Sequence, residues 1–255
     1  MEAALDGFWP AHSLVFAGLA ALVFLPLEHL FPARADQRRS AWAADLVFAT
    51  AGAWLARAGT IVGVGAALAA LDRVAPDQPL FAGVRDARMR TGLDIACGLA
   101  LFELGGYGYH RLAHKVPWLW RLHRLHHSSV SMDWLASFRQ HPLEILLMTL
   151  AQNALLVLAG IPLGAHTVVV VTLRLATVFV HANLRVPEGP WNWFVATPRF
   201  HHRHHQLGGI TCNYASLLPA IDRIFGTYRS ETATTFGLKP AQSARASTML
   251  SSIEQ

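Results

Sequence analysis

Five apolar stretches constrain this chain more than any other feature of its sequence. They cover about residues 12–31, 41–71, 91–109, 142–160 and 163–181. A helix needs about 20 mostly apolar residues to cross a bilayer, and these stretches approach or exceed that length. Charged residues such as Asp45, Glu103 and Arg174 interrupt them. Because a charge at membrane depth is costly unless it faces protein, we expect these helices to pack against one another as an integral-membrane, all-α bundle.

The overall composition agrees with this fold class. Hydrophobic residues make up 53% of the chain and charged residues 15%, where a soluble domain usually carries about 25% charged residues. This balance excludes a disordered chain and argues against an ordinary cytosolic globule. The net charge of +5 does not indicate nucleic-acid binding, because basic residues form no run longer than a pair such as Arg38-Arg39.

The topology follows from one predicted turn and from the arginines. Gly160-Ile161-Pro162 predicts a tight turn that joins the last two stretches into a hairpin. The hairpin would leave the polar segments 110–141 and 182–255 on one face. Loop 32–40 and the tail are rich in arginine, which is typical of cytoplasmic segments. We therefore expect a multi-pass protein with both polar segments on the cytoplasmic face, although the arginines at 85–90 would then lie on the other side.

The ends and the second stretch complete the expected organisation. The first twelve residues contain no lysine or arginine, so we expect no cleavable signal peptide. The second stretch is either one tilted span or a kinked pair around Gly59. We expect membrane helices over 1–91, a catalytic membrane and cytosolic region over 92–230, and a disordered tail over 231–255.

Histidine is the second unusual feature, with fourteen residues in the chain. Eight of them form three clusters, which are His110 and His114, then His123, His126 and His127, then His201, His204 and His205. Residues three and four apart share one face of a helix, so each HxxHH motif predicts a triangle of ring nitrogens. Eight imidazoles suffice for two metal ions with three to four nitrogens each.

A single histidine in a helix is usually structural, but three clusters in a chain otherwise poor in histidine indicate a metal site. Imidazole suits iron, zinc and copper. A structural zinc site needs only four ligands, and a zinc hydrolase needs a glutamate base that no cluster contains. The two cysteines, Cys97 and Cys212, lie outside the clusters and are too few for an iron–sulfur cluster. A pair of redox-active irons fits the ligand set best.

The other histidines differ in their context. His12, His29 and His166 stand alone in apolar segments, and we interpret them as structural. His181 ends the fifth stretch on the predicted metal side, so we expect it to be a ninth ligand. His202 lies off the face of its motif and is expected to support the ligands or face solvent. His141 follows the second cluster closely and could orient a ligand.

Taken in order, the three clusters resemble the fatty acid hydroxylase and sterol desaturase superfamily of integral-membrane, non-haem di-iron oxygenases. Flanking residues carry the same resemblance over about 95–230. They are Glu103 and Tyr107 before the first cluster, Arg139 to Glu144 after the second, His181-Ala-Asn183, Thr197 to Phe200, Asn213-Tyr-Ala215, and Ile221-Asp222 to Thr227. Glu103, Ala215 and Ile221 depart from the family's usual Asp, Gly and Trp.

The resemblance implies that the eight clustered histidines are metal ligands, with His181 joining them. It also implies a four-helix transmembrane core capped by a cytosolic helical domain. Residues that would hold the ligands in place are Glu103, Tyr107, His141, Asn183, His202 and Asp222. Substrates in this family are lipids such as sterols, fatty acyl chains, sphingolipids, carotenoids and alkylglycerols, and the sequence does not choose among them.

These observations predict an O2-dependent enzyme that hydroxylates or desaturates an unactivated C–H bond of a lipid with two iron ions. Hydroxylation is favoured because it requires only one hydrogen abstraction to be positioned. Electrons must come from an external ferredoxin or cytochrome b5-type donor, since Gly63-x-Gly65 lacks the third glycine of a dinucleotide fingerprint. The alternative is a membrane metal carrier or sensor. Transporters place ion sites near the bilayer midplane, whereas these clusters lie outside the apolar stretches, which favours the enzyme.

Overall fold

The structure is a computed structural model that describes residues 9–39, 42–52, 65–74, 76 and 78–239. The described residues form helices and no strand, apart from an isolated bridge between Pro32 and Leu184. This confirms the all-α class that the apolar stretches predict.

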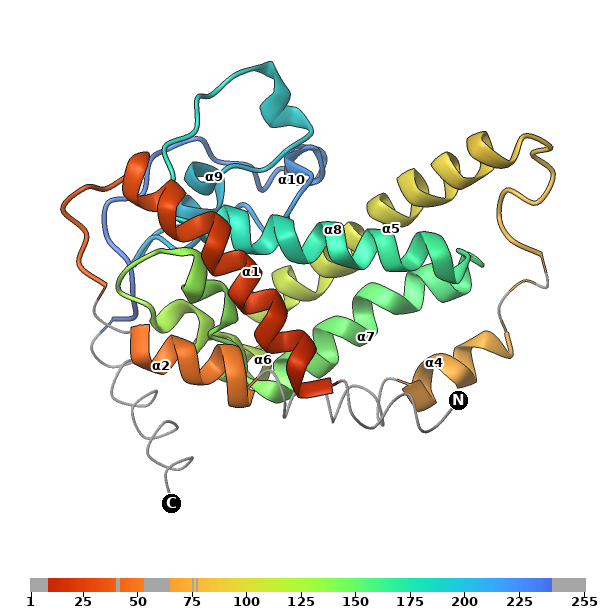
Figure 1. The fold of residues 1–255 in the computed structure, drawn as a ribbon, viewed down its shortest axis with the longest axis horizontal. Helices are drawn as coiled ribbons and strands as arrows, with labels where there is room; N and C mark the ends of the chain where they lie inside the picture. Colours follow the sequence, from red (N-terminus) through yellow and green to blue (C-terminus); the bar gives the residue numbers. More distant parts are fainter. Residues whose placement is uncertain (1–8, 40–41, 53–64, 75, 77, 240–255) are drawn as a thin grey trace.

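Four of the five apolar stretches are long helices (Figure 1). They are α1 (Trp9–Leu30), α5 (Ala87–Lys115), α7 (Pro142–Leu158) and α8 (Leu163–His181). The second stretch contains α2 (Trp42–Val47), the π-helical turn η1 (Phe48–Gly52) and α4 (Gly65–Asp72). Gly59, the expected kink, lies outside the described residues.

Helix α5 is the central element, because α7 and α8 both pack against it. Its N-cap is Asp86, whose side chain accepts a hydrogen bond from the Met89 amide at 2.7 Å. Glycine allows the closest approach: a Cβ on Gly105 would lie 2.5 Å from the carbonyl oxygen of Ala151 in α7. The helix continues through His110 and His114 before Pro117 begins the next one.

The chain reverses between α7 and α8 as the sequence predicts. Gly160 adopts a φ of 63°, which glycine tolerates best, and its amide donates to the Val157 carbonyl at 2.9 Å. The next amide, that of Ile161, donates to the Leu156 carbonyl at 3.0 Å. These two bonds form a Schellman cap, which ends α7 and starts the return of the chain.

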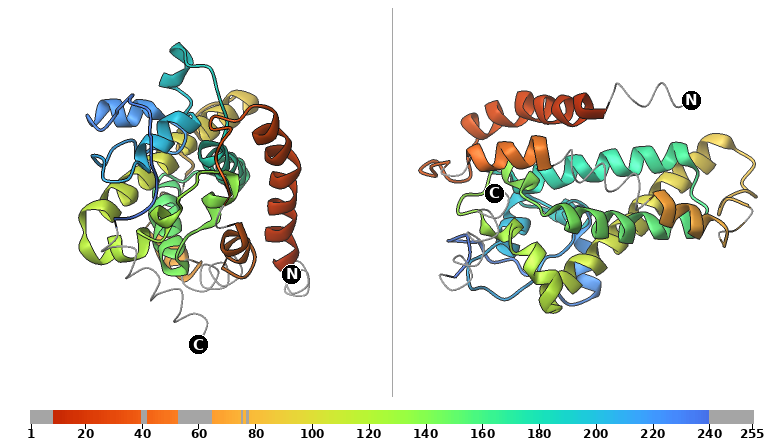
Figure 2. Two further views of the ribbon diagram at one scale, coloured as in Figure 1. Left: turned by 90° about the vertical axis from the view of Figure 1, so that its left-hand side faces the viewer. Right: turned by 90° about the horizontal axis from the view of Figure 1, so that it is seen from below.

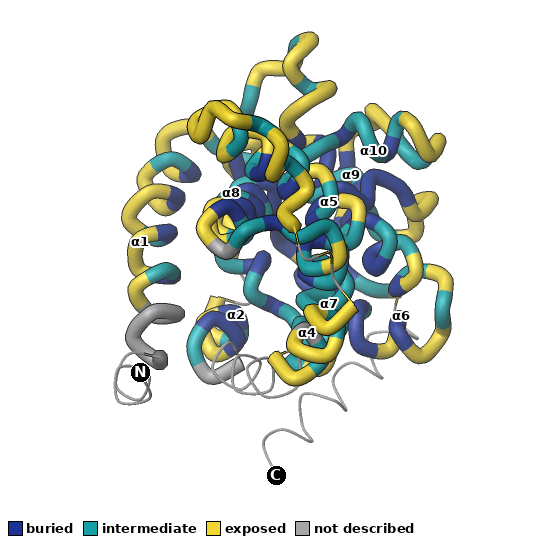
Figure 3. The backbone as a smooth tube through the Cα atoms, turned by 90° about the vertical axis from the view of Figure 1, so that its right-hand side faces the viewer, coloured by how far each residue is buried: buried dark blue, intermediate teal, exposed yellow. Residues whose placement is uncertain are grey.

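Helix α1 packs through one side only. Ala20 and Phe24 form a buried cluster with Trp134 of the 3₁₀ helix η4 (Trp134–Phe138) and with Val178 of α8. Its other side carries exposed leucines and valines, including Leu22 at 75% exposure. Figure 3 shows this exposed outer side of α1. Such a large unpartnered apolar surface suits contact with lipid better than contact with water.

Short helices gather at the end of the bundle where α5 and α8 finish (Figures 1 and 2). They are α6 (Pro117–His123), η3 (His126–Ser128), η4, η5 (Pro190–Trp193), α9 (Pro198–His204) and α10 (Pro219–Ile224). We call them the cap. Residues 231–239 differ from the expected disordered tail, because Ala233 and Phe236 are buried against Met132.

One helix among the described residues is long and apolar enough to cross a membrane by itself, over Gly164–His181 in α8. Two shorter apolar helical segments accompany it, over Val15–Leu30 and Pro142–Leu158. Polar residues such as Asp45, Asp94 and Glu103 interrupt the other apolar stretches, and each of these side chains is buried inside the protein.

Candidate metal centre

Nine histidines converge in the cap as two adjacent groups. The first cluster contains His110, His114, His123, His127 and His204, and the second contains His126, His181, His201 and His205. In each cluster, one ring nitrogen from every residue lies within 4.8 Å of the others. The structure therefore brings together every histidine that the sequence nominates as a ligand, including His181.

The two HxxHH motifs do not form the triangles expected from helical spacing. Helix α6 ends at His123, and the separate 3₁₀ helix η3 carries His126 and His127. His127 therefore joins His123 in the first cluster, whereas His126 points into the second. His127 Nε2 lies 3.1 Å from His123 Nε2, whereas His126 Nε2 lies 3.0 Å from His181 Nε2.

The third motif is divided in the same way, although it belongs to one helix and its end. His204 Nε2 lies 3.1 Å from His127 Nε2 in the first cluster. His201 and His205 join the second cluster, with their Nε2 atoms 3.1 Å apart. Each motif thus serves both clusters.

Backbone carbonyls set the ring orientation of several histidines. The Nδ1–H groups of His110, His126, His181 and His204 donate to the carbonyls of Tyr214, Arg139, Thr177 and Cys212, at 2.8, 3.2, 2.7 and 2.7 Å. A carbonyl can only accept, so Nδ1 carries the hydrogen in these neutral rings and Nε2 carries a lone pair.

The Nε2 atoms meet at distances that call for a cation between them. Neighbouring Nε2 atoms in both clusters lie 3.0–3.2 Å apart. Ligand nitrogens about 2.1 Å from an ion and at right angles lie about 3.0 Å apart, which matches this spacing. Without a cation, converging lone pairs repel one another, so the nitrogen set fits a bound metal.

Burial keeps the clustered histidines of the short helices neutral, as metal ligands must be. Desolvation lowers the pKa of His123, His126, His127, His204 and His205 well below the ordinary value, and neighbouring imidazoles lower it further. His201 behaves in the same way for the same reason. At neutral pH these rings offer lone pairs and do not need to release a proton before binding an ion.

Glu144 supports the site, although the sequence motif that contains it gives it no role there. Its fully buried carboxylate lies in the first turn of α7 and accepts a hydrogen bond from His123 Nδ1. Such carboxylate–histidine pairs orient metal-ligating rings and raise their basicity. The sequence signal for this residue is its position in the first turn of a helix that starts at Pro142, just after the second histidine motif.

Trp120 was also missed, because a tryptophan in a short amphipathic helix is usually packing. Its ring centroid lies 5.1 Å from that of His114 and 5.5 Å from that of His127. It therefore covers the side of the first cluster where His114, the least buried of these histidines, is located.

Three of the predicted supporting residues, Asp222, Glu103 and Tyr107, hold the segment that follows the third histidine motif. Asp222 accepts hydrogen bonds from the amides of Tyr214 and Ala215 at 2.9 and 2.8 Å. Glu103 accepts from the amides of residues 216–218 at 2.5–3.2 Å. The Tyr107 hydroxyl lies 3.0 Å from that of Thr227. Together they fix the segment whose Tyr214 carbonyl orients His110.

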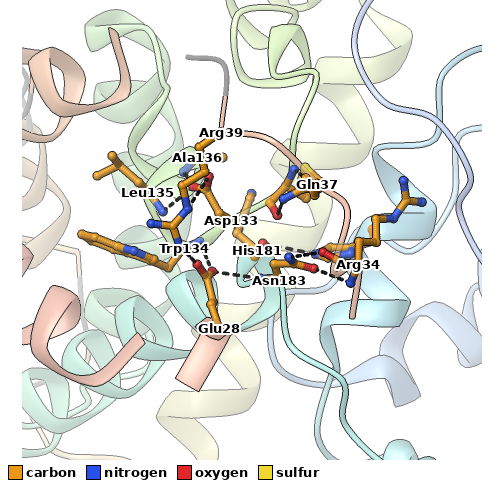
Figure 4. Close-up of polar contacts among 12 residues, drawn as sticks. Glu28, Arg34, Gln37, Arg39, Asp133, Trp134, Leu135, Ala136, His181 and Asn183 are labelled. Atoms are coloured by element: carbon orange, nitrogen blue, oxygen red, sulfur yellow. Dashed lines mark hydrogen bonds and ion pairs between the residues drawn. The ribbon is translucent and has the colours of Figure 1, made fainter. Parts of the chain in front are cut away.

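Asn183 supports the second cluster, together with Glu28, a residue far away in sequence. Glu28 of α1 accepts hydrogen bonds from the amides of Asn183 and Trp134 at 2.9 and 2.8 Å (Figure 4). The Asn183 side chain in turn binds the backbone of Arg34 on both its amide and its carbonyl. This network fixes the chain just after His181, which belongs to the second cluster.

The last two predicted supporting residues behave differently from each other. His202 is buried and does not face solvent, and its Nε2–H donates to the His181 carbonyl at 3.1 Å. Burial lowers its pKa to about 4. His141 contacts no ligand histidine in the described structure. It caps α7, with Nδ1 accepting from the Leu143 amide at 3.2 Å, and it lies close enough to Glu144 to interact with that carboxylate, so its role in orienting a ligand stays a prediction.

Comparison with known proteins connects this geometry to a family. The sequence model described as fatty acid hydroxylase matches residues 95–227, just over half of the chain. Over 138 residues the chain is 31% identical to an ornithine lipid hydroxylase, OlsE, from Rhizobium tropici. It is 31% identical over 131 residues to the alkylglycerol monooxygenase of Homo sapiens, and 28% identical over 144 residues to the human cholesterol 25-hydroxylase. No solved structure matches.

The matched regions cover 53%, 51% and 52% of this chain, respectively. They span 42%, 29% and 50% of the three relatives' own lengths. All nine clustered histidines and Glu144 lie within the matched residues 95–227. Glu28 and Arg34, which fix the second cluster from outside, do not.

Proposed function

Because the chain belongs to the fatty acid hydroxylase family, we propose that it is a membrane-bound, metal-dependent oxidoreductase that hydroxylates a lipid with O2. The single observation that carries this proposal is the pair of adjacent histidine clusters, nine neutral imidazoles in all, within the region that the family shares. The relatives' names, which specify three different lipids, support a lipid substrate without choosing one.

The proposed cofactor is a pair of iron ions. His110, His114, His123, His127 and His204 would hold one ion, and His126, His181, His201 and His205 the other. When bound, an iron pair supplies the redox chemistry by which O2 oxidises an unactivated C–H bond. Hydroxylation places one oxygen atom of O2 in the lipid and the other in water, which consumes two electrons and two protons.

The chain's own residues prepare the site for this chemistry. Backbone carbonyls hold Nδ1–H of four histidines, so that Nε2 points into the clusters before any metal arrives. The Glu144 carboxylate holds the His123 ring in the same way, and burial raises the pKa of this carboxyl group to about 7. Because the clusters are buried, water has little access to the reacting atoms.

The proposed electron donor is a separate protein of ferredoxin or cytochrome b5 type. The described structure holds no pair of cysteines near the clusters, since Cys97 lies in α5 and Cys212 is single and buried. The chain also lacks the glycine fingerprint of a dinucleotide site. Electrons for each turnover would therefore enter from outside, on the cap.

The proposed topology places the cap at the cytoplasmic face of a multi-pass bundle. The α7–α8 hairpin returns the chain to the end of α5, so the second and third histidine motifs lie on the same side as the first. The exposed apolar surface of α1 and the spanning length of α8 support embedding of this bundle in a bilayer.

The experiment that tests this function is purification with iron, followed by reduction and exposure to O2 with a lipid extract as substrate. We expect two irons per chain, O2 uptake that depends on reductant, and a lipid product that is heavier by one oxygen atom. A protein that binds and exchanges metal without consuming O2 would instead be the carrier or sensor considered above. Turnover with NAD(P)H alone would contradict the external donor.

A further inference from the structure

The cap carries an exposed aromatic and aliphatic surface that plays no part in the metal centre. It consists of Trp191, Trp193, Phe194 and Val195 from η5 and the residues after it, with Ile224 and Phe225 from the end of α10. We call these six residues the aromatic patch. Phe194 is 69% exposed and Ile224 is 77% exposed, the two largest values in the patch. The segment around η5 projects away from the helices in two perpendicular views (Figures 1 and 2).

The two halves of the patch are held together by one arginine. The Arg223 guanidinium lies over the Trp193 ring, with its carbon 4.5 Å from the ring centroid, and donates to the Asn192 carbonyl at 3.1 Å. The same guanidinium lies 3.7 Å from the Tyr228 ring centroid. The exposed side chains therefore sit on a braced surface. Soluble proteins rarely expose a contiguous apolar surface of this kind without a partner.

The position of the patch along α5 indicates which partner it has. Phe225 stacks on Tyr107 of α5 with ring centroids 5.1 Å apart, and residues 216–218 bind Glu103. Tyr107 lies three residues before His110, about 5 Å along the helix axis away from the metal end, and Glu103 lies a further turn away. Phe225 is thus level with the part of α5 that lies between the metal clusters and the apolar stretch.

The surrounding charge fits an anionic lipid surface. Arg199 and Arg229 are exposed beside the patch. A small hollow beside it is lined by Arg199 and Arg229, together with Asn192 and a single acidic residue, Glu188. Tryptophan and other aromatic residues with adjacent arginine are the residues enriched at the boundary between lipid headgroups and acyl chains.

From these observations we propose that the aromatic patch inserts into the headgroup boundary of the cytoplasmic leaflet and anchors the cap to the bilayer. The occupant is the lipid surface itself, with the arginines contacting lipid phosphates. This inference rests on the bilayer embedding in the proposed function. Its consequence is a fixed height of the metal centre above the acyl chains from which the lipid substrate comes.

The test places an environment-sensitive fluorophore on single cysteines of the full-length protein in bilayers that contain lipids spin-labelled at chosen depths. Cys97→Ser provides the background, because Cys212 is buried and its pKa is raised to about 11 by burial, so that it reacts poorly. Labels at Phe194→Cys and Ile224→Cys should lose most of their emission to lipids labelled near the headgroup. A label at Val130→Cys, an equally exposed apolar residue of the cap, should keep its emission.

A second control separates this inference from the embedding on which it rests. Val171 of α8 is 50% exposed and lies within the candidate span. A label at Val171→Cys should be quenched by lipids labelled deep in the acyl chains. If that label is quenched and those at 194 and 224 are not, the patch proposal is overturned and the embedding stands. If none is quenched, the embedding itself fails.

Substitutions in the η5 part of the patch test whether that part is needed for the α10 part to insert into the bilayer. The double substitution Trp193→Ser and Phe194→Ser should restore most of the emission of a label at Ile224→Cys, while Val130→Ser should not. Bound metal should remain unchanged, because neither residue contacts the clusters. Emission at 224 that changes with protein concentration and not with lipid label would show a second copy of the chain on the patch and would overturn the proposal.

Discussion

The His123 ring donates its Nδ1 hydrogen to the Glu144 carboxylate, and both side chains are almost completely removed from solvent. His123 belongs to the first cluster and Glu144 to the first turn of α7, so the pair links the metal site directly to a helix of the bundle. A carboxylate buried with one oxygen unpartnered is costly in isolation, and its place beside a ligand gives it a function.

Glu144→Gln should therefore weaken metal binding without removing a ligand. Loss of a carboxylate that supports a ligating histidine typically lowers metal affinity about 10–100-fold. Competition with a chelator of known affinity measures the change. Glu231→Gln is the control, since that carboxylate is exposed and pairs with Arg203, whose side chain is not a ligand, so the affinity should stay unchanged. Equal affinities of Glu144→Gln and the unmodified protein would remove Glu144 from the site.

His126 and His127, adjacent in the second motif, should bind different metal ions. His126→Ala should empty the second cluster and His127→Ala the first, so each variant should keep one iron of two and lose turnover. His204→Ala should resemble His127→Ala. Metal analysis with an iron-specific spectrum of each remaining ion distinguishes the two clusters.

The control for these variants is His141→Ala, which removes a histidine of the same region that caps α7 and belongs to neither cluster. It should keep both irons. If His126→Ala or His204→Ala kept two irons and full activity, its motif would not belong to the site.

The metal-free protein should become less stable in mild acid. Burial lowers the pKa of His126, His127 and His204 in the folded state, whereas the unfolded chain titrates near about 6.5. Below that pH the unfolded chain binds more protons, so the free energy of unfolding falls as pH falls, and it levels off only below the lowered folded pKa values.

Thermal unfolding of the metal-free protein at several pH values between about 7.5 and about 5 measures this dependence. The unfolding temperature should decrease steadily below about pH 6.5. Bound metal should oppose this loss of stability, because an ion that binds only the folded protein stabilises it. An unfolding temperature that does not change over this range would show that these histidines are already solvated.

Both polar segments should be reached from the same side of the membrane. Val130 follows the second motif and Ile210 follows the third, and both are exposed. Membrane-impermeant thiol reagents applied to oriented vesicles should label Val130→Cys and Ile210→Cys together, from the cytoplasmic side. Labelling of the two from opposite sides would exclude the hairpin topology.

Much of this architecture is already present in local sequence. The apolar stretches predict α1, α5, α7 and α8, and Gly160 predicts the turn between the last two, because length, hydropathy and glycine conformation are local properties. The histidine spacing identifies eight of the nine cluster members, and the position of His181 at the end of the fifth stretch identifies the ninth, because so many imidazoles in an apolar chain have few other uses.

Local sequence does not show which histidine joins which cluster, because that depends on how the helices pack. Helical spacing predicts a triangle from each HxxHH motif, but it assumes one continuous helix and ligands that meet only each other. In the folded chain α6 ends at His123, and His126 meets His181 from 55 residues away. Glu28 likewise reaches Asn183 across 155 residues. Sequence spacing shows in which direction side chains point within one helix. The ligands that share a metal site come from separate helices, so their partners depend on how the whole bundle packs.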